Sequence, residues 1–589
     1  MKKKKHSPLV VAALAITTYS PILAEDFVID TLDLDVTFVG DREVLLQDAH
    51  KQLHWPEAAN FSNDKPTFSY NIIPKRLNVQ PEWTRNGPIR LKINEPLPRL
   101  YKGYVNAGMG NFLSPLLQVS YSDVRSRTKS WGVHFLHEST DGGFAGDSIE
   151  QGFSSNQLNG WYRKFWKGEA FTASSSYQRE HISLYGGQRT QWTDSATFTA
   201  PDAFNYQLVT NRVHLSNRLK TNASWKHDLA VQHEFLWNDD AAQEHNFDLS
   251  LKVSGLLDTI PVHVNFHANV DRLNRIQEGE RALNERQAIV DLHPGIEKTF
   301  GPLKTSIGMG LWIDAQGEQP FLFAPEIDAS VSLLRDLFVP YVRIDGGIDQ
   351  NRYRSGLEAN PFVALPSNAL PDSNKTWNNT YETFHAALGM KGSITKSFSF
   401  NLNAEIKRNN QHLFWVQDNA YSDGRSFDPL FQDVTITSLQ GDATWNLGKT
   451  TALHGRVAQH NYNFRDSITN DQAAWFLPQF ELESTITHTI KNKLRLRANL
   501  LIQTGRAGLS SSGAEDIGTP IAIRETNRIV GFATELDNIA LLNLQAEYLY
   551  NARLSGWLKI DNVLNQANPF FTGYNNQNFR FQMGASYSF

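Results

Sequence analysis

The chain has 589 residues, a net charge of −5 and no cysteine, which excludes disulfides and thiolate metal sites. Its acidic and basic residues are nearly balanced, so the charge gives no reason to expect a nucleic-acid partner. The mean hydropathy of −0.41 excludes a bundle of membrane-spanning helices. Aromatic residues nevertheless make up 11% and hydrophobic residues 40% of the chain, enough to coat strands that alternate apolar and polar side chains.

The first 24 residues have the features of an export signal. Four lysines, Lys2 to Lys5, precede an apolar run over residues 8–16, which is the order found in cleavable signals. That run is shorter than the roughly 20 residues that a helix needs to cross a bilayer. We expect cleavage after Ala24, although Ile22 is larger than the residue preferred three positions before a cut.

Residues 25–98 differ from the rest of the chain. They lack repeated alternation and contain seven prolines, which is typical of an irregular segment. Several charged side chains near its end would suit docking against a polar barrel interior: Lys75, Arg76, Arg85, Arg90, Lys92 and Glu95. We therefore expect a periplasmic or lumenal N-terminal segment over residues 25–98.

From Arg99 onward, apolar and polar side chains alternate with the period of a β-strand. In the last segment one face is apolar and holds Phe579, Phe581, Met583, Ala585, Tyr587 and Phe589. The other face is polar or small and holds Arg580, Gln582, Gly584, Ser586 and Ser588. Residues 398–407 and 494–503 repeat this split, which suits lipid on one side and water on the other. A soluble sandwich also alternates, so the connections are needed to decide.

The connections alternate between short and long, as the turns and loops of an outer-membrane barrel do. Short ones lie at residues 167–168, 220–224, 301–302, 395–397, 448–449 and 491–492. Long ones lie at 140–152, 186–204, 274–283, 355–376, 411–429, 506–538 and 563–576. The pattern predicts an all-β, transmembrane antiparallel barrel of about 22 strands over residues 99–589. Its aromatic end, Tyr587 and Phe589, is the expected C-terminal insertion signal for the barrel-assembly machinery.

Short motifs at both ends resemble a known family. Residues 555–566, the run Asn568 to Tyr574 and the final Tyr587-Ser-Phe589 resemble the last hairpin of TonB-dependent receptors. Residues 101–111 and 35–39 resemble the related barrels of Bacteroidota-type envelopes. The resemblance implies a 22-stranded barrel, an N-terminal plug in its lumen, and a TonB box pulled by an inner-membrane partner.

The N-terminal segment departs from that family pattern. Residues 25–98 are few for a complete plug and lack its glycine-rich signatures. A TonB-box-like stretch is present as Val36, Thr37, Phe38 and Val39, but four β-prone residues also occur by chance. Coupling to TonB or to other periplasmic proteins therefore stays open at the level of sequence.

Charged residues on the expected strands have apolar neighbours that face out, so they are expected to face the lumen. They are Lys226, Glu234, Asp314, Arg343, Asp345, Glu405, Lys407, Arg495, Arg497, Glu547, Lys559 and Asp561. Mixed charges of this kind pair across a lumen, anchor an internal segment or select a solute, and the sequence does not rank these roles.

No metal, cofactor or catalytic site is expected. His134 and His137 stand three residues apart on a strand and so point to opposite faces, and His263 and His267 lie about 13 Å apart on one face. Asp418, Asp423 and Asp428 do not have the spacing of a calcium loop. Residues 508–513 lack the nucleophile-elbow pattern, and the glycines of 108–110 and 308–310 indicate close packing rather than phosphate binding.

The sequence favours an outer-membrane transport protein, embedded in lipid, that binds a solute with its outer loops and imports it. One alternative is a barrel subunit or scaffold of an outer-membrane assembly or export complex, which the short N-terminal segment favours. A passive channel is the third, and so wide an open pore would weaken the permeability barrier.

Overall fold

A computed structural model describes residues 101–123, 126, 128–144, 151–186, 203–217, 224–239, 241–275, 283–363, 377–418, 425–465, 473–510, 520–523 and 528–589. The expected signal (1–24), the N-terminal segment (25–98) and the TonB-box-like Val36 to Val39 lie outside these residues.

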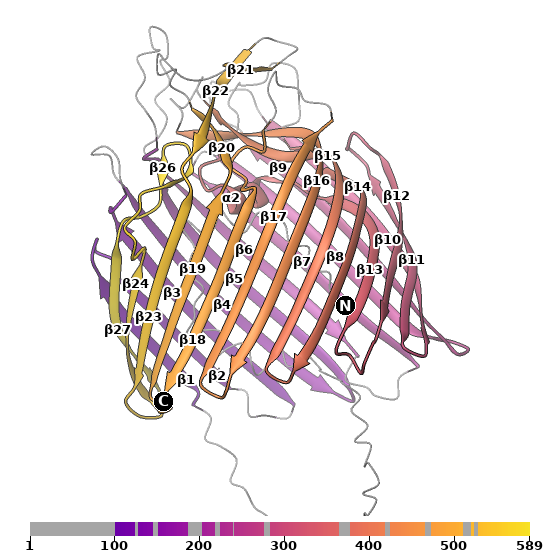
Figure 1. Cartoon of the computed structure of the whole chain (residues 1–589), viewed down its shortest axis with the longest axis horizontal. Helices are drawn as coiled ribbons and strands as arrows, with labels where there is room; N and C mark the ends of the chain where they lie inside the picture. Colours follow the sequence, from indigo (N-terminus) through magenta and orange to yellow (C-terminus); the bar gives the residue numbers. More distant parts are fainter. Residues whose placement is uncertain are drawn as a thin grey trace, which may run out of the picture. The chain divides into compact units, whose positions relative to one another are not determined.

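The described residues form a closed, antiparallel barrel of 22 strands, as the sequence predicted (Figure 1). The first eleven strands are β1 (Gly103–Gly110), β2 (Leu116–Asp123), β3 (Lys129–Asp141), β4 (Gly152–Trp166), β5 (Glu169–Ser183), β6 (Ala203–Ser216), β7 (Trp225–Asn238), β8 (Ala242–Leu257), β9 (Ile260–Arg275), β10 (Leu283–Phe300) and β11 (Leu303–Asp314). The others are β12 (Phe321–Val331), β13 (Val339–Asp349), β14 (Thr380–Thr395), β15 (Phe398–Asp418), β16 (Ser426–Leu447), β17 (Thr451–Phe464), β18 (Phe480–Ile490), β19 (Leu494–Thr504), β23 (Ile539–Leu549), β24 (Leu554–Asp561) and β27 (Arg580–Ser588).

The barrel closes where β1 pairs with β27. Their register joins Tyr104 to Ser588 and Gly110 to Gln582. The amide of Phe589 donates to the carbonyl of Gly103 at 2.9 Å, so the last residue completes the seam. A closed sheet leaves no strand edge facing lipid, where an unpaired amide or carbonyl would cost several kcal/mol.

The two faces of the sheet follow the predicted alternation. Met583 and Tyr587 of β27 are exposed on the outside, whereas Arg580, Gln582 and Ser586 are buried on the lumenal side. Exposed aromatic side chains also lie near the ends of strands at the short connections: Trp131, Trp166, Trp225, Phe300, Trp445, Tyr548 and Phe589. Such a girdle marks the membrane interface of outer-membrane barrels. Among the described residues, no helix is long and apolar enough to span a membrane.

The connections agree with the prediction in kind, with one correction. The C-terminus and the predicted short turns lie at one end of the barrel (Figure 1). The long connections lie at the other end, where the connections from β1 to β2 and from β7 to β8 are short. The expected loop over 411–429 is wrong, because β15 runs to Asp418 and β16 begins at Ser426. A membrane strand needs about 9–11 residues. These strands of 21 and 22 residues therefore extend beyond the membrane on the outer side.

Three long connections contain structure of their own. The one after β13 holds the helix α2 (Tyr353–Ala359). Residues 506–538 hold a three-stranded sheet of β20 (Arg506–Ser510), β21 (Pro520–Ile523) and β22 (Arg528–Leu536). The connection before β27 holds the hairpin of β25 (Pro569–Phe571) and β26 (Tyr574–Asn575).

Trp557 covers the seam from the lumenal side. Its indole nitrogen donates to the side-chain oxygen of Asn106 at 2.6 Å. Its ring lies over Gly108 and Gly584, where an added Cβ would stand 2.5 Å from ring atoms. The glycine of residue 108 therefore serves close packing, as its position in a strand predicted.

We expect Gly108→Val to impair closure of the barrel. The new side chain would meet the Trp557 ring at 2.5 Å and the backbone oxygen of Met583 at 2.8 Å, and such overpacking costs about 3 kcal/mol. The measurement is the electrophoretic shift between unheated and boiled protein, which reports the folded barrel. Gly160→Val is the matched control, because no atom lies within 4 Å of its added Cβ. Equal folded fractions in the two variants would contradict this account of the seam.

Candidate functional site: the barrel lumen and its outer mouth

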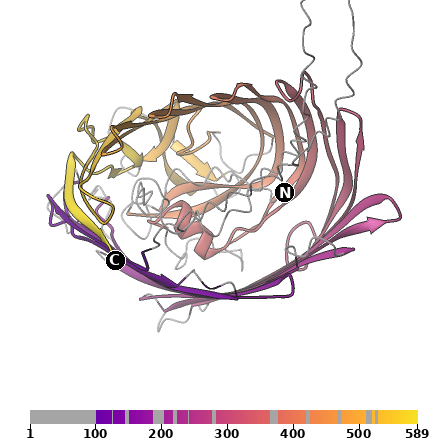
Figure 2. The ribbon, with the colours of Figure 1, turned by 90° about the horizontal axis from the view of Figure 1, so that it is seen from below.

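The connection that follows β13 folds into the barrel. Figure 2 shows α2 inside the ring of strands. Gln287 of β10 holds both arms of this connection, because its side-chain amide donates to the carbonyls of Asn351 and Trp377, each at 3.0 Å. Asn238 of β7 donates to the hydroxyl of Tyr353 at 2.9 Å. The helix is therefore fixed to the lumenal wall by buried hydrogen bonds from separate strands.

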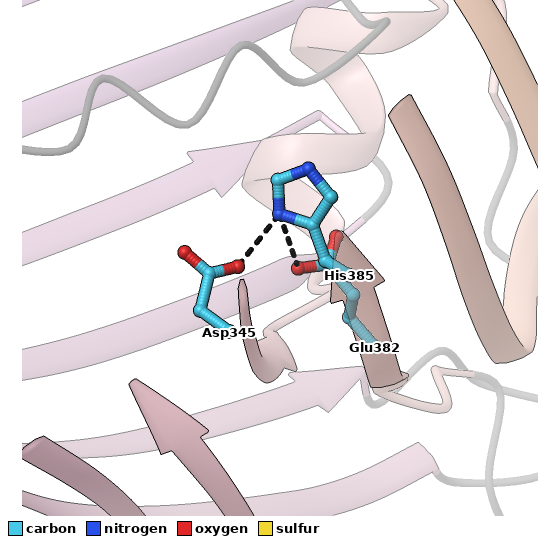
Figure 3. A group of neighbouring side chains, drawn as sticks. All are labelled: Asp345, Glu382 and His385. Atoms are coloured by element: carbon cyan, nitrogen blue, oxygen red, sulfur yellow. Dashed lines mark hydrogen bonds and ion pairs between the residues drawn. The ribbon is translucent and has the colours of Figure 1, made fainter. Parts of the chain in front are cut away.

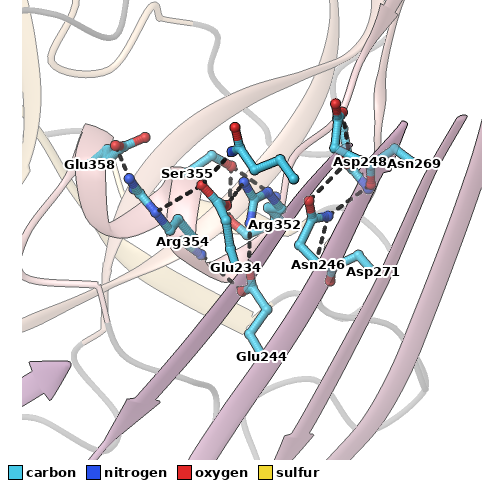
Figure 4. Close-up of polar contacts among 12 residues, drawn as sticks. Glu234, Glu244, Asn246, Asp248, Asn269, Asp271, Arg352, Arg354, Ser355 and Glu358 are labelled. Carbon is cyan, nitrogen blue, oxygen red and sulfur yellow. Dashed lines mark hydrogen bonds and ion pairs between the residues drawn. The ribbon is translucent and has the colours of Figure 1, made fainter. Parts of the chain in front are cut away.

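Arg352 anchors α2 electrostatically. Its guanidinium contacts Glu244 of β8 at 2.9 Å and also pairs with Glu234 of β7 (Figure 4). Glu244 in turn accepts a hydrogen bond from the backbone amide of Arg354 at 2.9 Å. Burial alone would lower the pKa of Arg352, but the charges of Glu244 and Glu234 outweigh it and raise the pKa above its ordinary value.

Outer connections meet in an aromatic hub, which we define as Tyr185, Phe362, Phe427, Phe476, Phe571 and Tyr574. Phe362 from the β13–β14 connection stacks on Tyr574 from the β24–β27 connection, with ring centroids 3.5 Å apart. Phe427 of β16 packs against Phe571 and against Phe476 of the β17–β18 connection. All six side chains but Tyr185 are at least 94% buried. Segments far apart around the barrel thus share one hydrophobic core at its outer end.

Hydrogen bonds fix the connections that carry the hub. The hydroxyl of Tyr185 donates to the carbonyl of Asn575 at 2.9 Å, and the hydroxyl of Tyr574 donates to the carbonyl of Arg425. Arg506 donates to the carbonyl of Pro569 at 2.8 Å and to that of Phe570. These hydrogen bonds join different connections to one another around the hub.

The lumenal charges lie mostly in pairs, either on neighbouring strands or on one strand. Arg343 lies 3.0 Å from Asp328, Lys407 lies 3.6 Å from Glu405, and Arg495 lies 3.5 Å from Glu547. Arg497 follows Arg495 on the same face of β19, and Lys226 lies near the start of β7.

A second charged group lies beside the seam. Lys559 lies 3.4 Å from Asp561, which also pairs with Arg580 at 2.7 Å, and Arg580 lies 3.6 Å from Glu138 of β3. Asp314, at the end of β11, accepts hydrogen bonds from Asn379 at 2.6 Å and from Tyr381 at 2.9 Å. These lumenal charges therefore have structural partners in this state of the protein.

A group on β13, β14 and β15 brings carboxylates around one imidazole. Nδ1 of His385 lies 2.6 Å from Asp345 and 3.8 Å from Glu382, and its Nε2 lies 3.5 Å from Glu405 (Figure 3). Glu382 and His385 are three residues apart and would face opposite sides of a regular strand. Register shifts at Asp345/Gly347 and at Glu382/Phe384 bring them together. The sequence analysis did not predict His385 and Glu382 as site residues, because nothing in the order of residues indicates these bulges.

Other histidines are arranged as the sequence predicted. His134 and His137 lie on β3, whose pairing with β2 and β4 shows no register shift, so they face opposite sides. His263 and His267 both face the lumen but do not share partners. His267 is hydrogen-bonded through its two ring nitrogens to Asp248 at 2.5 Å and Asp291 at 2.9 Å.

The remaining sequence candidates do not form sites. Asp418 ends β15, Asp428 lies within β16, and Asp423 lies outside the described residues. Gly508 lies in β20, a strand that is not followed by a described helix.

No protein-family model and no curated protein sequence matches the chain. Solved structures do match. The pyoverdine receptor FpvA from Pseudomonas aeruginosa superposes with a TM-score of 0.61 at 11% identity, over 84% of this chain and 79% of the receptor. The chain has the fold of an outer-membrane receptor.

Two further structures are similar to the same extent. The ferric-catecholate import receptor Fiu from Escherichia coli K12 has a TM-score of 0.59 at 10% identity, over 84% of this chain and 82% of Fiu. The FrpB iron transporter from Neisseria meningitidis has a TM-score of 0.60 at 8% identity, with the same coverage of both chains. The expected resemblance to TonB-dependent receptors is thus confirmed for the fold. The barrel and its apolar band place the protein in the outer membrane.

We expect Arg352→Ala to release α2 from the wall. The change removes the shorter of the cation contacts to Glu234 and the only side-chain cation paired with Glu244 in the described residues, while Arg354 stays 3.9 Å from Glu234. Breaking such a buried pair costs about 3 kcal/mol and favours release by a factor of about 100. Because the chain lacks cysteine, Ala359→Cys supplies a unique buried probe, and its labelling by a maleimide should accelerate when Arg352 is replaced.

Two controls accompany this labelling experiment. Glu358→Cys is exposed and should react equally in both backgrounds. Arg343→Ala removes a half-exposed lumenal pair and should leave labelling at Ala359→Cys unchanged. Slow labelling after Arg352→Ala would show that α2 is held without the ion pairs.

Proposed function

We propose that the protein imports a solute across the outer membrane, with the outer connections as its binding surface. The observation that supports this most is the fold, which is shared over more than four-fifths of the chain with receptors whose names specify pyoverdine, ferric catecholate and iron. Those similar structures are receptors and transporters rather than enzymes, in line with the absence of catalytic motifs in the sequence. The fold does not specify which solute this chain binds.

We further propose that residues 25–98 dock in the lumen and that Val36 to Val39 contact a periplasmic, TonB-like partner. A barrel of 22 strands encloses a space wide enough to leak unless something fills it. The paired charges of the wall, among them Arg495 with Glu547, offer polar contacts to such a segment. The barrel-assembly machinery would recognise Tyr587 and Phe589, and lipid would contact the apolar band.

A scaffold in an outer-membrane assembly is the second candidate. The aromatic hub favours it, because loops that share a hydrophobic core present a fixed platform rather than separate mobile arms. A passive channel is disfavoured by the same hub, since segments from opposite parts of the ring pack against each other at the outer end.

Conductance in planar bilayers tests the import proposal. We expect the full chain to carry no steady current and the chain without residues 25–98 to conduct, because the segment fills the lumen. Steady large currents from the full chain would overturn the proposal. Silence from both would place the seal in the outer connections rather than in the segment.

The hub gives a second conductance test. We expect Phe362→Ala with Tyr574→Ala to open the outer end in the chain lacking residues 25–98, because each truncation removes a buried ring at a cost of about 3–5 kcal/mol. The expected result is a higher single-channel conductance than in the truncated parent. Phe321→Ala with Phe323→Ala, two exposed rings on the outer face, is the control and should leave conductance unchanged. Equal conductance in the hub variant and the parent would show that the hub does not limit the opening.

A further inference from the structure

We propose that Asp345, Glu382 and His385 form a binding site for one divalent first-row transition metal ion on the lumenal wall. A ligand atom from each of the three side chains lies within 4.8 Å of the other two. Both carboxylates approach the same ring nitrogen, Nδ1 of His385, so the donors converge on one point (Figure 3). This site goes beyond solute import and does not depend on it.

The separations suit a single ion. Two ligand atoms that each stand about 2.1 Å from a tetrahedral ion lie about 3.4 Å apart. The distances from Nδ1 to Asp345 and Glu382 are 2.6 and 3.8 Å and bracket that value. Nδ1 now shares a hydrogen bond with Asp345, so binding would release the proton between them to water. Small rotations of the two carboxylates would then place all three donors in a coordination sphere, with the remaining positions open to water or to a solute in the lumen.

Glu405 supplies the outer shell that a ligating histidine usually has. Metal-bound imidazole commonly donates its other ring nitrogen to a carboxylate, which fixes the ring and strengthens the ligand. Nε2 of His385 points to Glu405 at 3.5 Å, on the side of the ring away from Asp345 and Glu382. Glu405 is itself held by Gln440, whose side-chain amide donates to it at 2.8 Å. In the structure Nε2 makes no hydrogen bond to a described residue, so Glu405 would have to move closer to accept one from the ring when an ion binds.

The donor set indicates the class of ion. One imidazole with two carboxylates suits Zn²⁺, Mn²⁺ or Fe²⁺, whereas Ca²⁺ and Mg²⁺ prefer oxygen alone. The chain has no cysteine, so the site offers no thiolate for a soft ion such as Cu(I). Three carboxylates surround His385, and Lys407 offsets only part of their negative charge, so this part of the wall attracts cations.

His267 provides a matched comparison within the same lumen. It also contacts two carboxylates, Asp248 and Asp291, but through opposite ring nitrogens. Those carboxylates lie on different sides of the ring and do not converge on one ion. His267 is therefore a lumenal histidine of similar surroundings without the proposed geometry.

Calorimetry on the untagged, full-length protein in detergent, stripped with chelator, tests the proposal with Zn²⁺ and Mn²⁺ as separate probes. We expect one ion per chain in the parent and in His267→Gln, and a loss of affinity of at least 10-fold in His385→Gln and Glu382→Gln. Glu405→Gln should weaken binding by about 10-fold or more while keeping the stoichiometry, as outer-shell changes do. Ca²⁺ should not compete.

Two results would overturn the site. The first is no binding of either ion to the parent, which would make the group a set of structural ion pairs. The second is equal binding by His385→Gln and the parent, which would place the ion elsewhere. The electrophoretic shift of the unboiled barrel confirms that each variant is folded, and in Mn²⁺-loaded parent protein the spin-resonance spectrum should show coupling to one nitrogen ligand. If His385→Gln does not fold, absence of that coupling in the parent would contradict the proposal.

Discussion

Hydrogen bonding between the first and last strands is the constraint on which the rest of the molecule depends. A sheet in lipid cannot leave an edge, so β1 and β27 must pair along their length. The register of that pair fixes which side chains of β27 face lipid and which face the lumen, because the side-chain period is two residues. Trp557 and the glycines beneath it make the seam close enough for the pairing to form.

The outer part of the barrel is stabilised in a different way from the part within the membrane. Within the membrane, side chains on the outer face are mostly apolar and most lumenal charges are paired. Beyond it, long strands such as β15 and β16 continue into water and carry the walls of a hydrophobic core. The connections fold inward and bury their apolar residues against those walls, and α2 is fixed by buried ion pairs as well. The proposed import would therefore require movement of connections that pack against one another.

Histidines on the lumenal wall show how local backbone geometry decides chemistry. On the regular strand β3, His134 and His137 stand three residues apart and face opposite sides. On β14, Glu382 and His385 have the same spacing but converge, because bulges on β13 and β14 shift the register. Two residues with the same separation in sequence thus face opposite sides of one strand and lie side by side on the other.

The sequence by itself determined the barrel, its strand number, the faces of its strands and the positions of its short turns, because alternation and turn residues are local signals. It also predicted that Asp345, Glu405 and Lys407 face the lumen, because their apolar neighbours on the strand face out. Only the tertiary structure decided that β15 and β16 continue through the expected loop, that six outer side chains form one hub, and that His385 joins Asp345 and Glu382. Those features arise from register shifts and from contacts between residues far apart in the chain. No repeating pattern of residues in the sequence predicts either of these.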